Sequence, residues 1–156
     1  MRRNDREITD KNKIKEIISK SKVLHLGLFD EIYPYIVPLH FGYEFSNDTI
    51  FLFVHGAKEG HKIDLINKNP NVCVEFECDV KQVSGGDIPC RYGSEYASII
   101  GRGKAEIVED LQEKIKGLNL LMENQTGHSF EFNEKMADSV AVIKITLNDY
   151  TAKARQ

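Results

Sequence analysis

Several common features are missing from this 156-residue sequence, and each absence excludes a class of protein. No apolar run approaches the roughly 18 residues that are needed to span a bilayer. The N-terminus also lacks the apolar core of a signal peptide. The motifs GxSxG, HExxH and GxGxxG, which mark many hydrolases, metalloproteases and dinucleotide-binding proteins, do not occur. These absences predict a cytoplasmic protein outside those enzyme classes, with no membrane partner.

Cysteine is scarce, and no charge of one sign dominates. The three cysteines, Cys73, Cys78 and Cys90, form no CxxC pair, so free thiols are expected in a reducing cytoplasm. The formal net charge is -3, and the basic residues between Arg2 and Lys22 alternate with acidic ones. Such alternation is typical of a solvated helix face. The sequence therefore gives no electrostatic reason to expect a nucleic-acid partner.

The patterns that are present predict a single domain over residues 1–156, built mainly of strands. Alternating or continuous apolar runs predict six strands, and helical spacing of apolar residues predicts three helices. The strands are expected at residues 23–29, 33–45, 49–55, 72–78, 95–108 and 139–147, and the helices at 10–20, 61–69 and 111–122. Short turns between strands and helices outside the strand run favour a six-stranded antiparallel β-barrel with peripheral helices.

Proline and glycine refine this prediction. Pro34 and Pro38 lack the N–H group that a central ladder needs, so their strand is expected at an edge, bulge or barrel rim. Gly101 and Gly103 fall inside the longest predicted strand and indicate a bulge or a sharp bend. Residues 79–93 contain two adjacent glycines and a proline, and are expected to be irregular.

The residues most suited to bind a ligand lie between the third predicted strand and the short helix. Gly60 precedes the helix, and His61 and Lys62 open it, so free N–H groups, the helix dipole and a cation come together. Lys58 lies in the loop, and His55 ends the preceding strand. These are the components of an anion site, although on composition alone an ordinary surface turn is the simpler explanation. His40, His55 and His61 match no usual zinc spacing, and no metal is predicted.

The order of motifs adds to this interpretation. The relevant segments are residues 1–10, 34–43 (PYIVPLHFGY), 53–64 (FVHGAKEGHKID), 69–72, 96–105 (YASIIGRGKA) and 151–153. In this order and spacing, the sequence resembles the pyridoxamine 5′-phosphate oxidase-related FMN-binding split barrels. Within them it is most similar to the nitroimidazole-resistance (Nim-type) branch. The resemblance spans nearly the whole chain.

The resemblance implies a six-stranded split barrel that forms a homodimer, with FMN in clefts at the subunit interface. His55 would lie at the reactive face of the flavin as the catalytic residue. Lys62 would hold the phosphate, at the same place as the anion site inferred above. The full set of cofactor-binding residues implied by the resemblance is Val37, Pro38, Leu39, His40, His55, Lys58, Gly60, His61, Lys62 and Ser98.

Two functions remain open at this stage. The first is an FMN-dependent oxidoreductase that acts on a small organic substrate, with nitroimidazoles and other nitroaromatics as candidates. The second is a non-catalytic flavin-binding or redox-sensing module, in which the cysteines could take part. A related barrel that uses haem or a deazaflavin is a third possibility, which an absorption spectrum would reveal.

Overall fold

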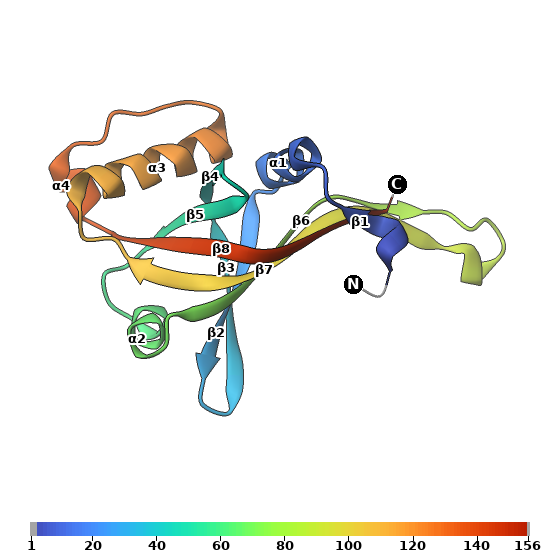
Figure 1. Cartoon of the computed structure of the whole chain (residues 1–156), viewed down its shortest axis with the longest axis horizontal. Helices are drawn as coiled ribbons and strands as arrows, with labels where there is room; N and C mark the ends of the chain where they lie inside the picture. The colour runs from blue at the N-terminus through green and yellow to red at the C-terminus, as the bar shows by residue number, and fades with distance from the viewer. Residues whose placement is uncertain (1–2, 156) are drawn as a thin grey trace.

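One antiparallel sheet organises the chain, which is described over residues 3–155 by a computed structural model (Figure 1). The strands are β1 (Glu7–Ile8), β2 (Val23–Asp30), β3 (Tyr33–His40), β4 (Gly42–Ser46), β5 (Thr49–Gly56), β6 (Asn71–Val83), β7 (Gly93–Ile107) and β8 (Ala141–Arg155). The helices are α1 (Lys11–Lys20), α2 (His61–Lys68), α3 (Leu111–Thr126) and α4 (Glu134–Asp138), with short 3-10 turns at Asn4–Arg6 and Pro89–Arg91.

The sheet runs in the order β3-β2-β6-β7-β8-β5-β4, and β1 pairs with β8. Strand β3, at one end of this order, also contacts β5 near the other end, so the sheet curls into an incompletely closed barrel. The prediction of a mainly β, antiparallel split barrel with peripheral helices is confirmed. The structure has eight strands rather than six, because β1 is additional and the predicted strand 33–45 is divided into β3 and β4.

The division between β3 and β4 occurs at Phe41, whose side chain is fully buried. Its carbonyl oxygen accepts hydrogen bonds from the side-chain amides of Asn124 (2.9 Å) and Gln125 (3.1 Å) on α3. These bonds satisfy a buried backbone acceptor that the strand ladder no longer pairs. The contact therefore depends on α3, more than 80 positions later in the chain, which explains why the local pattern did not reveal it.

The core fills the inside of the barrel. Alternate residues of the strands point inward, among them Leu24, Leu26, Phe76, Ile99 and Ile143, all at 0% exposure. Helix α1 closes one side with Ile14, Ile17 and Ile18, as the sequence predicted, and Asp10 caps its first turn. Helix α3 packs on the outer side of β5, where Leu118 and Phe53 belong to a second, smaller core.

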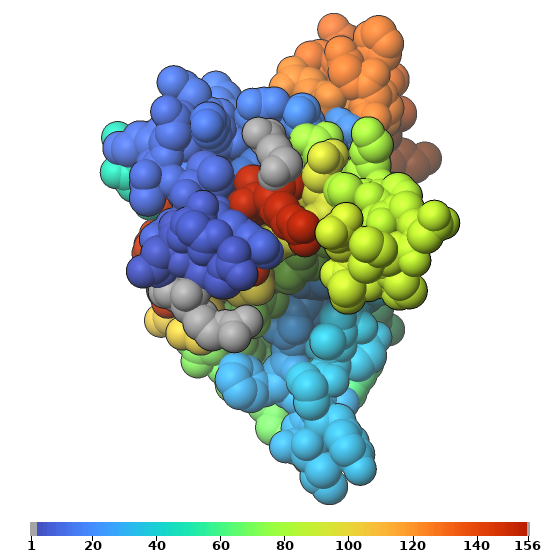
Figure 2. All heavy atoms as spheres, turned by 90° about the vertical axis from the view of Figure 1, so that its right-hand side faces the viewer, coloured from blue at the N-terminus to red at the C-terminus, as the bar shows by residue number. Residues whose placement is uncertain are grey.

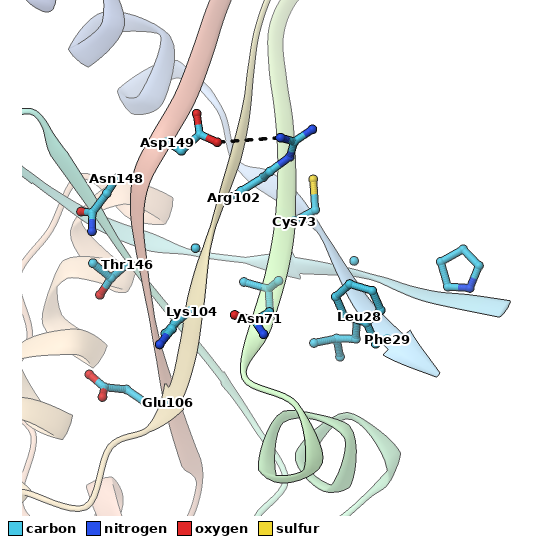
Figure 3. A pocket seen from close by; sticks show the side chains of 14 residues that line it. Leu28, Phe29, Asn71, Cys73, Arg102, Lys104, Glu106, Thr146, Asn148 and Asp149 are labelled. Atoms are coloured by element: carbon cyan, nitrogen blue, oxygen red, sulfur yellow. Dashed lines mark ion pairs between the residues drawn. The ribbon is translucent and has the colours of Figure 1, made fainter. Parts of the chain in front are cut away.

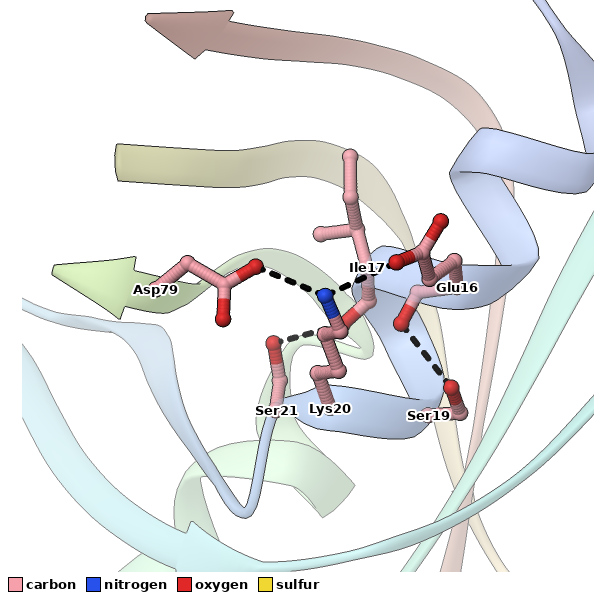
Figure 4. A network of polar contacts seen from close by, with 6 residues as sticks. All are labelled: Glu16, Ile17, Ser19, Lys20, Ser21 and Asp79. Atoms are coloured by element: carbon pink, nitrogen blue, oxygen red, sulfur yellow. Dashed lines mark hydrogen bonds and ion pairs between the residues drawn. The ribbon is translucent and has the colours of Figure 1, made fainter. Parts of the chain in front are cut away.

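The prediction that residues 79–93 are irregular is wrong at both ends. Strand β6 continues to Val83 and β7 begins at Gly93, so the two form a long hairpin with a bulge after Cys78. At the bulge, Asp79 has a positive φ of 56° and accepts a hydrogen bond from Lys20 Nζ at 3.0 Å. Lys20 also pairs with Glu16 at 2.8 Å, so α1 holds the bulge in place (Figure 4). The glycines and the proline are confined to the hairpin's far end, which protrudes beside the C-terminal end of β8 (Figure 2).

The predicted bulge at Gly101 and Gly103 is confirmed. The register of β7 against β8 shifts between Arg102 and Gly103. A Cβ atom at Gly103 would lie 1.8 Å from the carbonyl oxygen of Thr146, so the close approach requires glycine there. Beyond this bulge β8 continues to Arg155, well past the predicted end at residue 147.

The edge position predicted for the proline-containing strand is also confirmed. Among the described strands, β3 pairs only with β2. Strand β3 contains Pro34 and Pro38, and its edge opposite β2 therefore keeps unpaired backbone polar groups. Within residues 3–155, no helix is both long and apolar enough to cross a membrane.

Candidate functional site

The loop after β5 leads into α2, and its geometry suits a bound anion. Gly60 has a φ of 131° and a ψ of 168°, a conformation that only glycine adopts readily, and its surroundings are open. Its carbonyl oxygen accepts the first helical hydrogen bonds, from the N–H groups of Ile63 (2.9 Å) and Asp64 (3.2 Å). Within residues 3–155, no side chain caps this helix. The N–H groups at the start of α2 therefore remain available to a ligand.

Lys62 supplies the cation at this helix start. Its side chain is half-buried and folds back over the end of β5, where a Cβ atom at Gly56 would lie 2.8 Å from Nζ. Burial lowers the pKa of Lys62, and no acidic group among residues 3–155 counteracts that effect. A bound anion would compensate the cost of burying this ammonium group.

His55 lies close to Lys62 at the end of β5. Partial burial lowers the pKa of His55, and the charges of Lys62 and His40 lower it further. The imidazole is consequently neutral at pH 7, with one N–H donor and one acceptor nitrogen. The structure thus brings together three predicted residues from separate elements: His40 from β3, His55 from β5 and Lys62 from α2.

His61 has a different environment from the one that a phosphate ligand needs. Its Nε2 lies 2.8 Å from Oδ2 of Asp30, and its ring meets Tyr35 edge-on at 5.0 Å between centroids. The Asp30 carboxylate offsets any positive charge that His61 carries. His61 therefore fixes the start of α2 to the β2–β3 hairpin, and Lys62 is the better placed cation for an anion.

The segment Val37 to His40 lies on the edge strand β3. Val37 and Leu39 are half-buried and pack against the core, whereas Pro38 and His40 are exposed. His40 Nδ1 lies 3.1 Å from the carbonyl oxygen of Lys22. Because β3 contacts β5 without pairing with it, the free backbone edge lies in the neighbourhood of the same loop.

Ser98 is not brought to this cluster within one chain. It pairs with Glu77 and Lys153 in the middle of the sheet. His55 pairs with Val142, and the next residue of β8, Ile143, pairs with Ile107. Ile107 therefore marks the part of β7 that lies near His55. Ser98 and Ile107 are separated by roughly 30 Å along the strand, at about 3.3 Å per residue. Lys58, by contrast, lies exposed in the loop beside the helix start.

A groove of about 800 Å³ lies across β2, β6, β7 and β8, and none of the predicted site residues lines it (Figure 3). Its cations, Arg102 and Lys104, are balanced by the acids Glu106 and Asp149. Arg102 and Asp149 face each other at 3.9 Å. Because the groove carries no net charge, it is less suited to a phosphate than the start of α2. Sequence reasoning missed it, since Gly101 and Gly103 indicated only a bend.

The fold defines the class: a split barrel, which also occurs in flavin- and haem-binding proteins of known structure. The flavocytochrome Anf3 from Azotobacter vinelandii aligns with a TM-score of 0.78 and 16% identity, over 100% of this chain and 72% of that one. A FAD- and haem-binding protein from Mycobacterium smegmatis aligns with a TM-score of 0.79 and 14% identity, over 97% and 74%. At these identities the similarity shows the fold alone.

The chain belongs to the pyridoxamine 5′-phosphate oxidase family, whose sequence pattern it matches over residues 10–154. A candidate 5-nitroimidazole antibiotic resistance protein from Bacteroides thetaiotaomicron is 36% identical, with a TM-score of 0.79. The alignment covers 95% of this chain and 86% of that protein. No curated protein sequence matches the chain significantly.

Proposed function

We propose that this protein binds FMN and acts as an FMN-dependent oxidoreductase on a small organic substrate. The observation that carries the proposal is the start of α2, where uncapped N–H groups, Gly60 and the ammonium group of Lys62 come together. Within the described part of the chain, this ammonium group has no acidic partner. Together they form a site for a phosphate group. Family membership supports a flavin nucleotide as the ligand that carries this phosphate group.

The residues present fit FMN. The N–H groups at the start of α2 and Lys62 would hold the phosphate, with Lys58 close by in the loop. The free edge of β3, from Val37 to His40, would offer backbone polar groups to the isoalloxazine ring. When bound, the flavin supplies the electron-transfer chemistry, and the protein contributes binding, orientation and electrostatics.

His55 is proposed as the catalytic residue at the reactive face of the ring. Its lowered pKa keeps the imidazole neutral at pH 7, so that one ring nitrogen can hold a proton while the other accepts a hydrogen bond. The neighbouring Lys62 favours this neutral form. The N–H group of this neutral imidazole would donate a hydrogen bond to the substrate, and solvent would supply the protons taken up on reduction.

Nitroaromatic compounds are the substrate class that we propose to test first. The support comes from the relative at 36% identity, which is a candidate 5-nitroimidazole antibiotic resistance protein. Steady-state turnover of a nitroimidazole with a reductant would support the assignment. Tight FMN binding without turnover of any acceptor on a broad panel would instead support a non-catalytic flavin-binding module.

We further propose a homodimer in which the second chain completes the cofactor cleft. Ser98, which the family resemblance implies to be a cofactor-binding residue, lies too far along the sheet from His55 to share a cofactor with it within one chain. The β2–β3 hairpin carries exposed apolar side chains that a second copy could cover, namely Phe29, Ile32, Tyr33 and Ile36. The proposal predicts a molar mass of two chains in light scattering, and a reduction to one chain in an Ile36→Glu variant.

Cysteine-based redox sensing is less well supported. Burial raises the pKa of the Cys78 thiol, with a further contribution from Asp79. A raised pKa reduces the thiolate fraction and with it the reactivity of the group. Cys73 on β6 and Cys90 in the Pro89–Arg91 turn are both exposed free thiols.

The absorption spectrum of the purified protein tests the cofactor proposal. We expect a yellow protein that releases FMN on denaturation, identified by mass. A colourless protein that takes up no added FMN would contradict the proposal. A Soret band without flavin absorption would instead indicate the haem chemistry of the more distant structural relatives.

A further inference from the structure

A cluster of three potential metal ligands lies on the outer face of the barrel, on the paired strands β2 and β6. His25 on β2 stands directly opposite Glu75 on β6, and Glu77 follows two residues later on the same strand. Because the side chains of a strand alternate, Glu75 and Glu77 project from the same face. Their inward neighbours Val74 and Phe76 are fully buried, so this face is the outer one.

The spacing of the three side chains fits a metal ion. Nδ1 of His25 lies 3.1 Å from Oε2 of Glu75, and one ligand atom from each of the three residues lies within 4.8 Å of the other two. Ligands bound at about 2.1 Å in tetrahedral or octahedral geometry lie roughly 3.0 to 3.4 Å apart. Small side-chain rotations on the paired strands β2 and β6 would therefore bring the three ligand atoms to the spacing that a bound metal ion requires.

The charges of the cluster also favour a cation. Within residues 3–155, Nδ1 of His25 contacts Glu75, and no lysine or arginine forms an ion pair with Glu75 or Glu77. Two adjacent carboxylates without a bound cation attract a divalent metal ion.

We propose that His25, Glu75 and Glu77 bind a divalent transition-metal ion of the Zn²⁺ type. One imidazole and two carboxylates suit such ions, whereas Ca²⁺ and Mg²⁺ prefer oxygen ligands alone. The side chains of His25 and Glu75 are 41% and 34% exposed, so solvent can supply the remaining ligands. His25 and Glu75 are 50 residues apart in the sequence, which explains why motif spacing did not predict the site.

Calorimetric titration of Zn²⁺ into tag-free, chelator-treated protein tests this proposal. We expect saturable binding of one ion per chain, weakened at least about tenfold in His25→Ala and in Glu77→Gln. His128→Ala, which removes another exposed histidine outside the cluster, is the matched control and should bind as the wild type does. Titration with Co²⁺ should give visible d–d absorption bands that the His25→Ala variant lacks.

The proposal would be overturned by the absence of saturable Zn²⁺ binding, or by unchanged affinity in His25→Ala. Circular dichroism and the melting temperature verify that each variant is folded, and the exposed, conservative Glu77→Gln substitution guards against misfolding. The FMN content of the wild-type protein is a separate readout; it is taken from the wild type because Glu77 pairs with Ser98 between β6 and β7. A protein that binds Zn²⁺ but no FMN would contradict the proposed function and leave the metal site standing.

Discussion

Helices α1 and α2 begin in opposite ways. At the start of α1 the Asp10 side chain accepts hydrogen bonds from the N–H groups of Asn12 (2.8 Å) and Lys13 (3.0 Å). Asp110 and Asn133 cap α3 and α4 in the same manner. At the start of α2 there is only Gly60, which has no side chain to cap the helix. Among the α-helices of residues 3–155, α2 alone lacks a side-chain cap.

The difference shows how a fold divides stability from binding. A carboxylate cap satisfies the free N–H groups from within and neutralises the helix dipole. Omitting it leaves both the donors and the dipole for an external anion, at some cost to the stability of the ligand-free protein. The predictions below separate these two roles, from the largest expected effect to the smallest.

The largest effect is expected from Lys62→Ala. Loss of a charge-assisted hydrogen bond to the phosphate should weaken FMN binding by about 1 to 3 kcal/mol. The stability of the ligand-free protein should change little, because Lys62 has no acidic partner within residues 3–155. Fluorescence titration with FMN gives the affinity, and urea unfolding gives the stability. Lys58→Ala, in the exposed loop, is the matched control. Equal losses of FMN affinity in both variants would contradict the assignment of Lys62 as the main cation that binds the phosphate.

Asp10→Ala and Gly60→Ala form the next pair. Loss of the Asp10 cap should destabilise the protein by about 1 kcal/mol and leave FMN affinity unchanged. Gly60→Ala should cost about 1 to 3 kcal/mol in the free energy of unfolding, because a φ of 131° is strained for alanine, and should also weaken FMN binding. Urea unfolding and FMN titration of both variants provide the comparison. If Asp10→Ala weakened FMN binding as strongly as Gly60→Ala does, the assignment of stability to the start of α1 and of binding to the start of α2 would be contradicted.

A smaller effect of opposite sign is expected from Asp30→Asn. The Asp30 carboxylate lies beside His61 at the start of α2, where it opposes an incoming phosphate. Its removal should tighten FMN binding by less than about 1 kcal/mol, since both groups are partly in water. The test is FMN titration at low ionic strength. Weaker binding would indicate that the Asp30–His61 pair positions the helix rather than repels the ligand.

The smallest effect concerns pH. Because the pKa of His55 is lowered by partial burial and by Lys62 and His40, the unfolded chain protonates first as the pH falls below about 6.5. Stability should therefore decrease below that pH and level off beneath the folded pKa. His55→Gln should show a shallower decrease, measured by urea unfolding midpoints at about pH 7.5 and about pH 5. An identical pH dependence in both proteins would contradict this account of His55.

Local patterns in the sequence were sufficient for much of the fold. The apolar spacing of Ile14, Ile17 and Ile18 located α1, and Pro34 and Pro38 located an edge strand. Capping and proline signals act within a few residues, so they can be read without knowing the rest of the structure. The loop from His55 to Lys62 was likewise found from local chemistry, although its assignment to FMN came from the family resemblance.

What the sequence could not provide was register between distant strands. The outer-face cluster exists because His25 pairs opposite Glu75, a match set by the packing of the whole barrel. The contact of His61 with Asp30 and the break between β3 and β4 at Phe41 have the same origin. The length of the β6–β7 hairpin was missed for a related reason. Pairing between β6 and β7 extends both strands into a segment that local propensity assigns to a loop.

The most direct test of the central claim compares the affinities of FMN and riboflavin, which differ only in the phosphate. If the start of α2 holds that phosphate, FMN should bind much more tightly than riboflavin to the wild type. Lys62→Ala should remove most of that difference while leaving riboflavin affinity unchanged. Equal affinity of the wild type for the two compounds would contradict the account.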